Sequence, residues 1–122
     1  MVVLIEDDTA VRDAVTFSLE AEGFAVEAWE NAESFLAAKI PAAAACLIVD
    51  FNLGGMSGLQ AVEELRRRGV RLPVIMTTTA PPRILTEWLA RTRTPLIEKP
   101  LLDDMLVGAI REALEPSSDA PT

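Results

Sequence analysis

The stretch LIVDFNLGGMSG, residues 47–58, places an aspartate, Asp50, directly after an apolar run. A carboxylate at the end of a buried strand is costly to desolvate unless a cation, hydrogen bonds or a reaction compensates its charge. Helix capping does not explain this residue, because the next helix start is the S-x-x-Q capping box of Ser57 and Gln60. We therefore interpret Asp50 as a functional side chain at the end of a strand.

On both sides of this stretch, short apolar segments alternate with longer segments whose apolar residues have helical spacing. We expect strands at residues 2–5, 24–28, 44–49, 73–77 and 94–97. The helical segments are expected to end near Gly23, Pro41, Gly69, Arg91 and Leu114. Five strands alternating with five helices predict an α/β fold with a parallel sheet covered on both faces. Right-handed crossovers make such a sheet doubly wound.

The length of 122 residues, half of them hydrophobic, suits one domain with a buried core. We expect the domain to span residues 1–115, and residues 116–122, PSSDAPT, to form a disordered tail or linker. No apolar run approaches the ~18 residues that a membrane span needs. The first residues begin a strand rather than a targeting peptide, so we expect a cytoplasmic protein that does not contact a membrane.

The composition excludes several kinds of chemistry. The net charge of −8 argues against direct nucleic-acid binding, which requires basic clusters. The chain has no histidine and no tyrosine, so it cannot form a Ser-His-Asp triad or an imidazole metal site. The single cysteine, Cys46, lies in an apolar run and is expected to be a buried thiol. Carboxylates, hydroxyls and lysines remain for polar chemistry.

Polar residues follow four of the expected strands, at the ends that a parallel sheet brings to one edge. In chain order they are Glu6-Asp7-Asp8, Asp50 with Asn52, Thr78, and Lys99-Pro100. Several acids beside one lysine make a poor general-base site, because like charges raise each other's pKa. A divalent cation such as Mg²⁺, which takes oxygen ligands and keeps several waters, would relieve this repulsion.

These residues resemble the receiver domains of two-component response regulators. The resemblance rests on an acidic pair after the first strand, an acid followed by M-S-G after the third, Thr78 five residues beyond Pro73, and a K-P pair. It covers about residues 2–115 and implies a flavodoxin-like fold with strand order 2-1-3-4-5. The segments A-E-S-F-L and I-E-K-P resemble in particular the receivers of nitrogen-fixation-type regulators.

The resemblance implies that Asp50 accepts a phosphoryl group from a sensor histidine kinase or a histidine phosphotransfer protein. Asp7, Asp50 and the backbone carbonyl of Asn52 would bind Mg²⁺, and Glu6 would act through water. Such a receiver catalyses only its own phosphorylation and dephosphorylation. The resemblance thus explains the costly carboxylate at the end of the third strand as a phosphoryl acceptor.

The remaining implied roles belong to the fourth and fifth strands. Lys99 would pair with the phosphoryl group, Thr78 would hydrogen-bond to it, and Pro100 would follow a cis peptide bond. Thr77 and Thr79 flank Thr78, so a slip of one residue stays open at this point.

The acidic triplet leaves two possible registers, because either Glu6 with Asp7 or Asp7 with Asp8 could be the acidic pair. We choose the first register, which puts Arg12 at the family's usual position in the first helix. Asp8 or Thr9 is then left to cap that helix. Asp7 is a metal ligand in both registers.

The sequence also departs from the receiver pattern. Gly54 and Gly55 replace a frequent Pro-Asp or Pro-Gly, and we expect them to loosen the loop after Asp50. Leu96 stands where the family places an aromatic residue that rotates on activation, so we expect signalling to be read elsewhere. The expected surface for an output domain or homodimer is the fourth helix with the fifth strand and last helix. Its proposed apolar groups are Ile84, Leu85, Trp88 and Leu89.

Two other classes of protein share part of this pattern, a phosphatase and a receiver that is not phosphorylated. A phosphatase of the haloacid dehalogenase type also begins from an aspartate at a strand end with Mg²⁺, but it would want a second acid where Asn52 stands. A degenerate receiver that binds partners without phosphorylation would not need the set Asp50, Asp7, Thr78 and Lys99, which is intact here.

Overall fold

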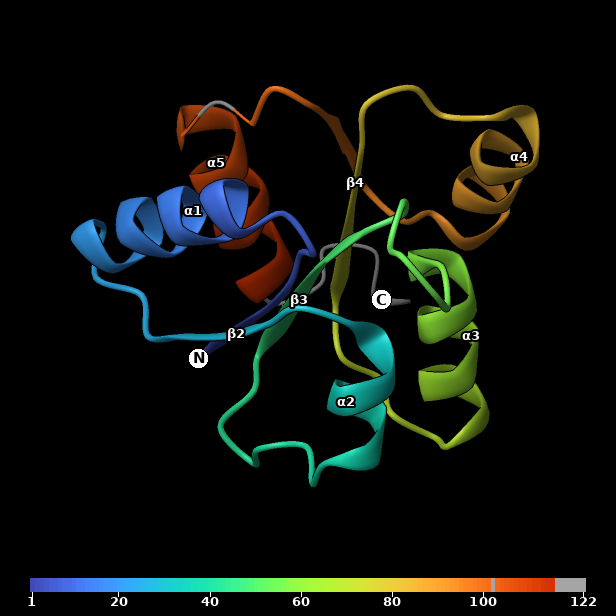
Figure 1. Ribbon diagram of the computed structural model, residues 1–122, viewed down its shortest axis with the longest axis horizontal. Helices are drawn as coiled ribbons and strands as arrows, with labels where there is room; N and C mark the ends of the chain where they lie inside the picture. The colour runs from blue at the N-terminus through green and yellow to red at the C-terminus, as the bar shows by residue number, and fades with distance from the viewer. Residues whose placement is uncertain (102, 116–122) are drawn as a thin grey trace.

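The structure, a computed structural model, describes residues 1–101 and 103–115 and consists of strands that alternate with helices along the chain (Figure 1). The strands are β1 Val2–Ile5, β2 Val26–Trp29, β3 Cys46–Asp50, β4 Val74–Thr78 and β5 Leu96–Glu98. The helices are α1 Thr9–Ala21, α2 Ala32–Ala37, α3 Gly58–Arg67, α4 Arg83–Thr92 and α5 Asp103–Leu114. The expected tail, residues 116–122, and residue 102 lie outside the described residues.

All strand pairs are parallel, and the order in the sheet is β2-β1-β3-β4-β5. Helices α1 and α5 cover one face, whereas α2, α3 and α4 cover the other (Figure 1). The predicted doubly wound sheet and its strand order are therefore confirmed. In such a sheet the strand order reverses beside β1 and β3, so a binding site is expected at their carboxyl ends.

The core forms two layers, one on each face of the sheet. In β1, Val3 and Ile5 belong to the layer under α2, α3 and α4, while Val2 and Leu4 belong to the layer under α1 and α5. This alternation follows from the two-residue period of a strand. Because both faces are covered, every residue of β1 and β3 is buried, which explains their continuous apolar sequences.

The starts of three helices agree with the capping residues in the sequence. The Asp8 side chain accepts a hydrogen bond from the Val11 N–H at 3.1 Å, and the Asn31 side chain accepts one from the Ser34 N–H. Ser57 forms the predicted capping box with Gln60. Asp8, rather than Thr9, is therefore the cap of α1.

Several element boundaries differ from the prediction. β2 begins at Val26, because the Phe24 N–H closes the end of α1 by bonding to the Leu19 carbonyl at 3.0 Å. β5 begins at Leu96, because Thr94 closes α4 in the same way. Helix α2 ends at Ala37, well before Pro41. Phe24 and Thr94 thus cap the preceding helices instead of beginning the strands that follow.

Helix α4 presents less apolar surface than expected. Leu85, Trp88 and Leu89 are buried, with Trp88 only 5% exposed, because spacings of three and four residues place them on one face. Ile84 points the other way and is 68% exposed. The prediction that Leu85, Trp88 and Leu89 add apolar groups to an exposed docking surface is therefore wrong. Pro82 stands at the N-cap of α4, so Pro81 and Pro82 both lie before the first turn of the helix.

Candidate functional site

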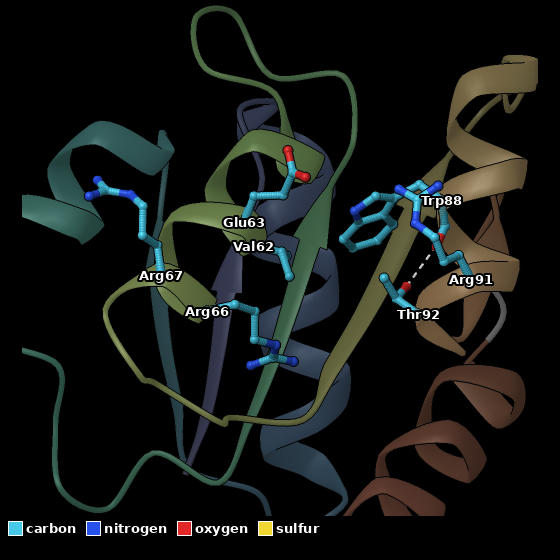
Figure 2. A pocket seen from close by; sticks show the side chains of 7 residues that line it. All are labelled: Val62, Glu63, Arg66, Arg67, Trp88, Arg91 and Thr92. Carbon is cyan, nitrogen blue, oxygen red and sulfur yellow. Dashed lines mark hydrogen bonds between the residues drawn. The ribbon is translucent and has the colours of Figure 1, made fainter.

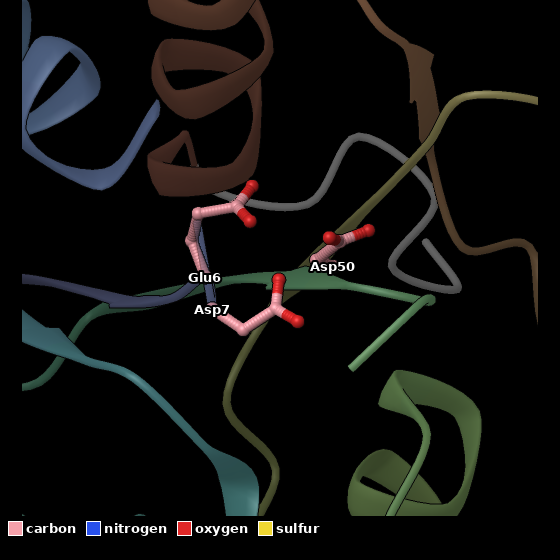
Figure 3. A group of neighbouring side chains, drawn as sticks. All are labelled: Glu6, Asp7 and Asp50. Atoms are coloured by element: carbon pink, nitrogen blue, oxygen red, sulfur yellow. The ribbon is translucent and has the colours of Figure 1, made fainter. Parts of the chain in front are cut away.

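Three acidic side chains meet at the carboxyl edge of the sheet. Glu6 and Asp7 follow β1, and Asp50 is the last residue of β3 (Figure 3). One carboxylate oxygen from each lies within 4.8 Å of the others. Glu6 and Asp50 are buried, at 1% and 3% exposure, whereas Asp7 is exposed. The cluster therefore has two inner carboxylates and one that faces solvent.

Lys99 joins the two buried carboxylates. Its Nζ donates to Glu6 Oε1 at 2.7 Å and to Asp50 Oδ2 at 3.0 Å. Burial and the nearby charge of Asp50 raise the pKa of Glu6, although the hydrogen bond from Lys99 opposes this rise. Burial alone would lower the pKa of Lys99, but its bonds to Glu6 and Asp50 outweigh burial and raise it. Lys99 thus carries the positive charge that these carboxylates require.

Asn52 connects the ends of β3 and β4. Its backbone N–H donates to Asp50 Oδ1 at 3.2 Å, and its side-chain amide donates to Thr78 Oγ1 at 3.1 Å. Thr78 is fully buried, whereas Thr79 is exposed. Thr78 is therefore the threonine whose hydroxyl bonds to Asn52, the residue that also bonds to Asp50.

Two hydrogen bonds hold Glu6, in the segment after β1, one to its side chain and one to its backbone carbonyl. Glu6 Oε2 accepts a hydrogen bond from the Asp8 N–H at 3.1 Å, and Arg12 donates to the Glu6 carbonyl at 2.8 Å. Because the Asp8 carboxylate caps α1, Glu6 and Asp7 are the acids of this segment that lie beside Asp50. The peptide bond between Lys99 and Pro100 is cis, as predicted.

Gly58 lets α3 approach the end of β3 closely. A Cβ at this position would overlap the backbone carbonyl oxygen of Asp50 and would lie 3.0 Å from Met76 Sδ. The Gly58 N–H also bonds to the Phe51 carbonyl at 3.1 Å. The glycine of the M-S-G segment is therefore required by packing against the backbone of Asp50.

The side chains fit a hard divalent cation. Three carboxylates whose oxygens lie within 4.8 Å form the oxygen donor set that Mg²⁺ or Ca²⁺ prefers. Among the described residues this is the only such group of acidic, cysteine or histidine side chains. The third protein ligand expected from the sequence, the carbonyl of Asn52, stays a prediction.

A groove of about 490 Å³ lies between α3 and α4, away from the acidic edge (Figure 2). It is lined by Val62, Glu63, Arg66, Arg67, Trp88, Arg91 and Thr92. The arginines occupy the last turns of the two helices, where cations offset the helix dipoles. The residues of the acidic cluster do not line this groove, so we place the functional site at the sheet edge instead.

Three contacts of the site were not foreseen from the sequence. The Asn52 amide bonds to Thr78, Arg12 holds the Glu6 carbonyl, and the Glu33 carboxylate of α2 accepts a hydrogen bond from the Met56 N–H. The bonds of Asn52 and Glu33 join residues 26 and 23 positions apart, and the bond of Arg12 is local. Only the pair of glycines before Met56 could have indicated a close approach there.

A parallel sheet with an acidic edge is consistent with the family that the chain matches by sequence. Residues 2–111 match the family described as "Response regulator receiver domain". The chain belongs to this family of two-component response regulators, as its sequence motifs predicted. Receiver domains of this family bind Mg²⁺ through acidic residues, and histidine kinases are their partners.

Similar proteins include "Transcriptional regulatory protein FixJ" of Azorhizobium caulinodans, 34% identical over 95% of this chain and 56% of that protein. "Transcriptional regulatory protein TdiR" of Thauera aromatica is 28% identical over 93% of this chain and 50% of its own length. The chain therefore spans about half the length of these curated relatives. The similarity to FixJ agrees with the resemblance to nitrogen-fixation-type regulators.

Solved structures support the same fold. The receiver domain of NtrX from Brucella abortus superposes with a TM-score of 0.84 at 28% identity, covering 96% of this chain and all of that one. The crystal structure of FixJ-N gives a TM-score of 0.82 at 28% identity, over 93% of this chain and 91% of the other. In the described part of the chain, no helix is long and apolar enough to cross a membrane.

Proposed function

We propose that this receiver domain accepts a phosphoryl group on Asp50 from a phosphohistidine of a sensor histidine kinase or histidine phosphotransfer protein. The observation that carries the proposal is the environment of Asp50 at the end of β3. This carboxylate is 3% exposed, and its two oxygens accept hydrogen bonds from Lys99 Nζ and the Asn52 N–H. A buried carboxylate with two such donors and two neighbouring acids is suited to a charged reaction rather than to packing.

In the proposed reaction, a carboxylate oxygen of Asp50 attacks the phosphorus of the phosphohistidine. The new P–O bond forms as the P–N bond breaks, and the imidazole leaves with the electron pair. Charge neutralisation and in-line positioning limit such a transfer more than proton movement does, which suits a site without histidine. Attack of water on the aspartyl phosphate then releases phosphate and restores Asp50.

The proposed ligands of Mg²⁺ are Asp7, Asp50 and the backbone carbonyl of Asn52, with Glu6 acting through water. When bound, Mg²⁺ would neutralise charge on the phosphoryl oxygens. Lys99, which bonds to Asp50 at 3.0 Å, would transfer its contact to the phosphoryl group. Thr78 would donate a hydrogen bond to the same group in place of its present contact with Asn52.

The proposed consequence of phosphorylation is a change of partner interactions. The relatives FixJ and TdiR are transcriptional regulatory proteins, so the partner would be an output domain or a second copy of the chain. The proposed surface is formed by α4, β5 and α5, where Ile84 and Met105 are 68% and 51% exposed. Neither direct nucleic-acid contact nor a membrane role is proposed for this acidic domain.

Beryllofluoride, a mimic of the phosphoryl group, tests this function against its two rivals. We expect Mg²⁺-dependent binding of beryllofluoride, seen by NMR as shifts of the Asp50, Thr78 and Lys99 amides. An absence of binding with Mg²⁺ present would favour a receiver that acts without phosphorylation. Steady turnover of small phosphate esters would favour a phosphatase of the haloacid dehalogenase type.

A further inference from the structure

The loop between β3 and α3, residues 51–57, is attached to the rest of the protein mainly at its ends. At one end, Asn52 bonds to Asp50 and Thr78. At the other end, the Met56 N–H donates to Glu33 Oε2 at 2.9 Å. Within the described residues, the backbone groups of residues 53–55 form no hydrogen bonds to the protein. The position of this middle segment therefore depends on the two ends.

The middle segment lies beside the carboxylates that are proposed to bind Mg²⁺. A Cβ built on Gly54 would stand 4.0 Å from Asp7 Oδ2. Asn52, at the start of the loop, contacts Asp50 through its backbone N–H. A displacement of the loop would therefore change the surroundings of both Asp7 and Asp50, which flank the place where Mg²⁺ and the phosphoryl group are proposed to bind.

Gly55 provides the space in which Glu33 reaches the loop. A Cβ on Gly55 would overlap Glu33 Oε2 and would lie 3.3 Å from its Cδ and 3.5 Å from its Oε1. The closest atoms to that Cβ all belong to Glu33. The hydrogen bond from Met56 lowers the pKa of Glu33, which agrees with a carboxylate that accepts it in the charged form. The two glycines were expected to loosen the loop, but one of them permits an attachment.

We propose that Glu33 is a positioning residue for the phosphorylation site. Its carboxylate fixes the β3–α3 loop through the Met56 N–H and thereby sets the affinity for Mg²⁺ and the lifetime of the phosphoryl group on Asp50. The proposal rests on the function proposed above. Glu33 reaches this loop from α2, a helix that supplies no other residue of the acidic site.

The hydrogen bond itself is tested without phosphorylation, by amide hydrogen exchange measured by NMR. We expect the Met56 amide to exchange roughly tenfold faster in Glu33→Ala, because a hydrogen bond to a charged acceptor is lost. Glu33→Gln retains an oxygen acceptor and should restore most of the protection. Unchanged exchange in Glu33→Ala would show that the contact does not hold the loop, whatever Asp50 does.

The consequence for the site is tested by Mg²⁺ titration and by the half-life of Asp50 phosphorylated with acetyl phosphate. In Glu33→Ala we expect Mg²⁺ affinity to fall by about threefold to tenfold, and the half-life to change by at least about threefold. Glu33→Gln should stay near wild type. Glu30→Ala is the charge-matched control, because Glu30 is also exposed and precedes the same helix, and it should leave both quantities unchanged.

A double-variant cycle separates positioning from general damage. Gly55→Ala should reproduce the effect of Glu33→Ala, since its Cβ displaces the Glu33 carboxylate. In a Glu33→Ala background, Gly55→Ala should add nothing, because the atoms that it would meet are gone. Independent, additive losses in the double variant would overturn the proposal. The proposal would also be overturned if the Met56 amide exchanged faster in Glu33→Ala while Mg²⁺ affinity and the half-life of phosphorylated Asp50 stayed at wild-type values. Failure of wild type itself to take up phosphoryl groups would instead refute the proposed function.

Discussion

Strand β3 carries a nucleophilic side chain at each end, and the two ends are buried almost equally. Cys46 at the amino end is 0% exposed, and Asp50 at the carboxyl end is 3% exposed. Cys46 lies among apolar side chains, and burial raises its pKa to about 11. Asp50 instead accepts hydrogen bonds from Lys99 and Asn52. Burial suppresses the reactivity of the thiol at one end, whereas charged and polar partners surround the proposed phosphoryl acceptor at the other.

The largest expected effect concerns the packing behind Asp50. Gly58→Ala should lower the free energy of unfolding by about 3 kcal/mol, because the new Cβ overlaps the Asp50 carbonyl oxygen and crowds Met76. Urea denaturation measures this loss. Gly108→Ala, in the exposed part of α5 with nothing within 4 Å, is the control and should gain up to about 1 kcal/mol. Equal stability of the two variants would show that the carboxyl end of β3 is not closely packed.

The second prediction separates two adjacent acids at the same edge. Asp7→Ala should weaken Mg²⁺ binding by at least about tenfold, because it removes a proposed carboxylate ligand. Asp8→Ala should leave Mg²⁺ affinity within about twofold of wild type but lower the unfolding free energy by about 1 kcal/mol, because it removes the cap of α1. Metal titration and urea denaturation give both quantities. Equal losses of Mg²⁺ affinity would support the other register of the acidic triplet.

The third prediction concerns the structural change in α4 when Asp50, at the polar end of β3, is phosphorylated. Phosphorylation or beryllofluoride should shift α4 and change the fluorescence of Trp88, which is buried and lines the groove between α3 and α4. Leu96 should keep its rotamer, since it lacks a ring that could exchange an exposed position for a buried one. A Trp29→Phe variant leaves Trp88 as the only tryptophan. Constant Trp88 emission, or a rotamer change of Leu96 in NMR spectra, would place the switch elsewhere.

The smallest effect on function is expected at the amino end of β3. Cys46→Ala should leave Mg²⁺ affinity and phosphoryl half-life within about twofold of wild type, while it costs about 1 kcal/mol of stability through the lost thiol packing. The folded wild type should resist alkylation by iodoacetamide at pH 8, where a thiol with a pKa of about 11 is almost fully protonated. Urea should expose Cys46 and permit reaction. Rapid alkylation of the folded chain would remove the contrast between the two ends.

Much of the fold follows from patterns that act over a few residues. The apolar runs of the strands, the helical spacing and the caps at Asp8 and Ser57 predicted the elements and their order. The strand order came from the resemblance to receivers. The topology then brought Glu6 and Asp50 together, because parallel strands end at one edge.

The sequence could not predict how side chains of separate elements meet. Trp88 turned out to be buried because the rotation of α4 about its axis is set by packing, which apolar content alone does not define. The bond between Glu33 and Met56 spans 23 residues and depends on the placement of α2 against the loop. The amide of Asn52 likewise reaches Thr78 across 26 residues. These contacts follow from tertiary geometry.

The most direct test of the phosphorylation site is the position of the phosphoryl group. Wild type and Asp50→Asn would be incubated with radiolabelled acetyl phosphate, with Mg²⁺ or with a chelator. We predict label on wild type only when Mg²⁺ is present, and none on Asp50→Asn, because an amide is neither an equivalent nucleophile nor an equivalent metal ligand. Label on Asp50→Asn at the wild-type level would contradict the assignment of Asp50 as the phosphoryl acceptor.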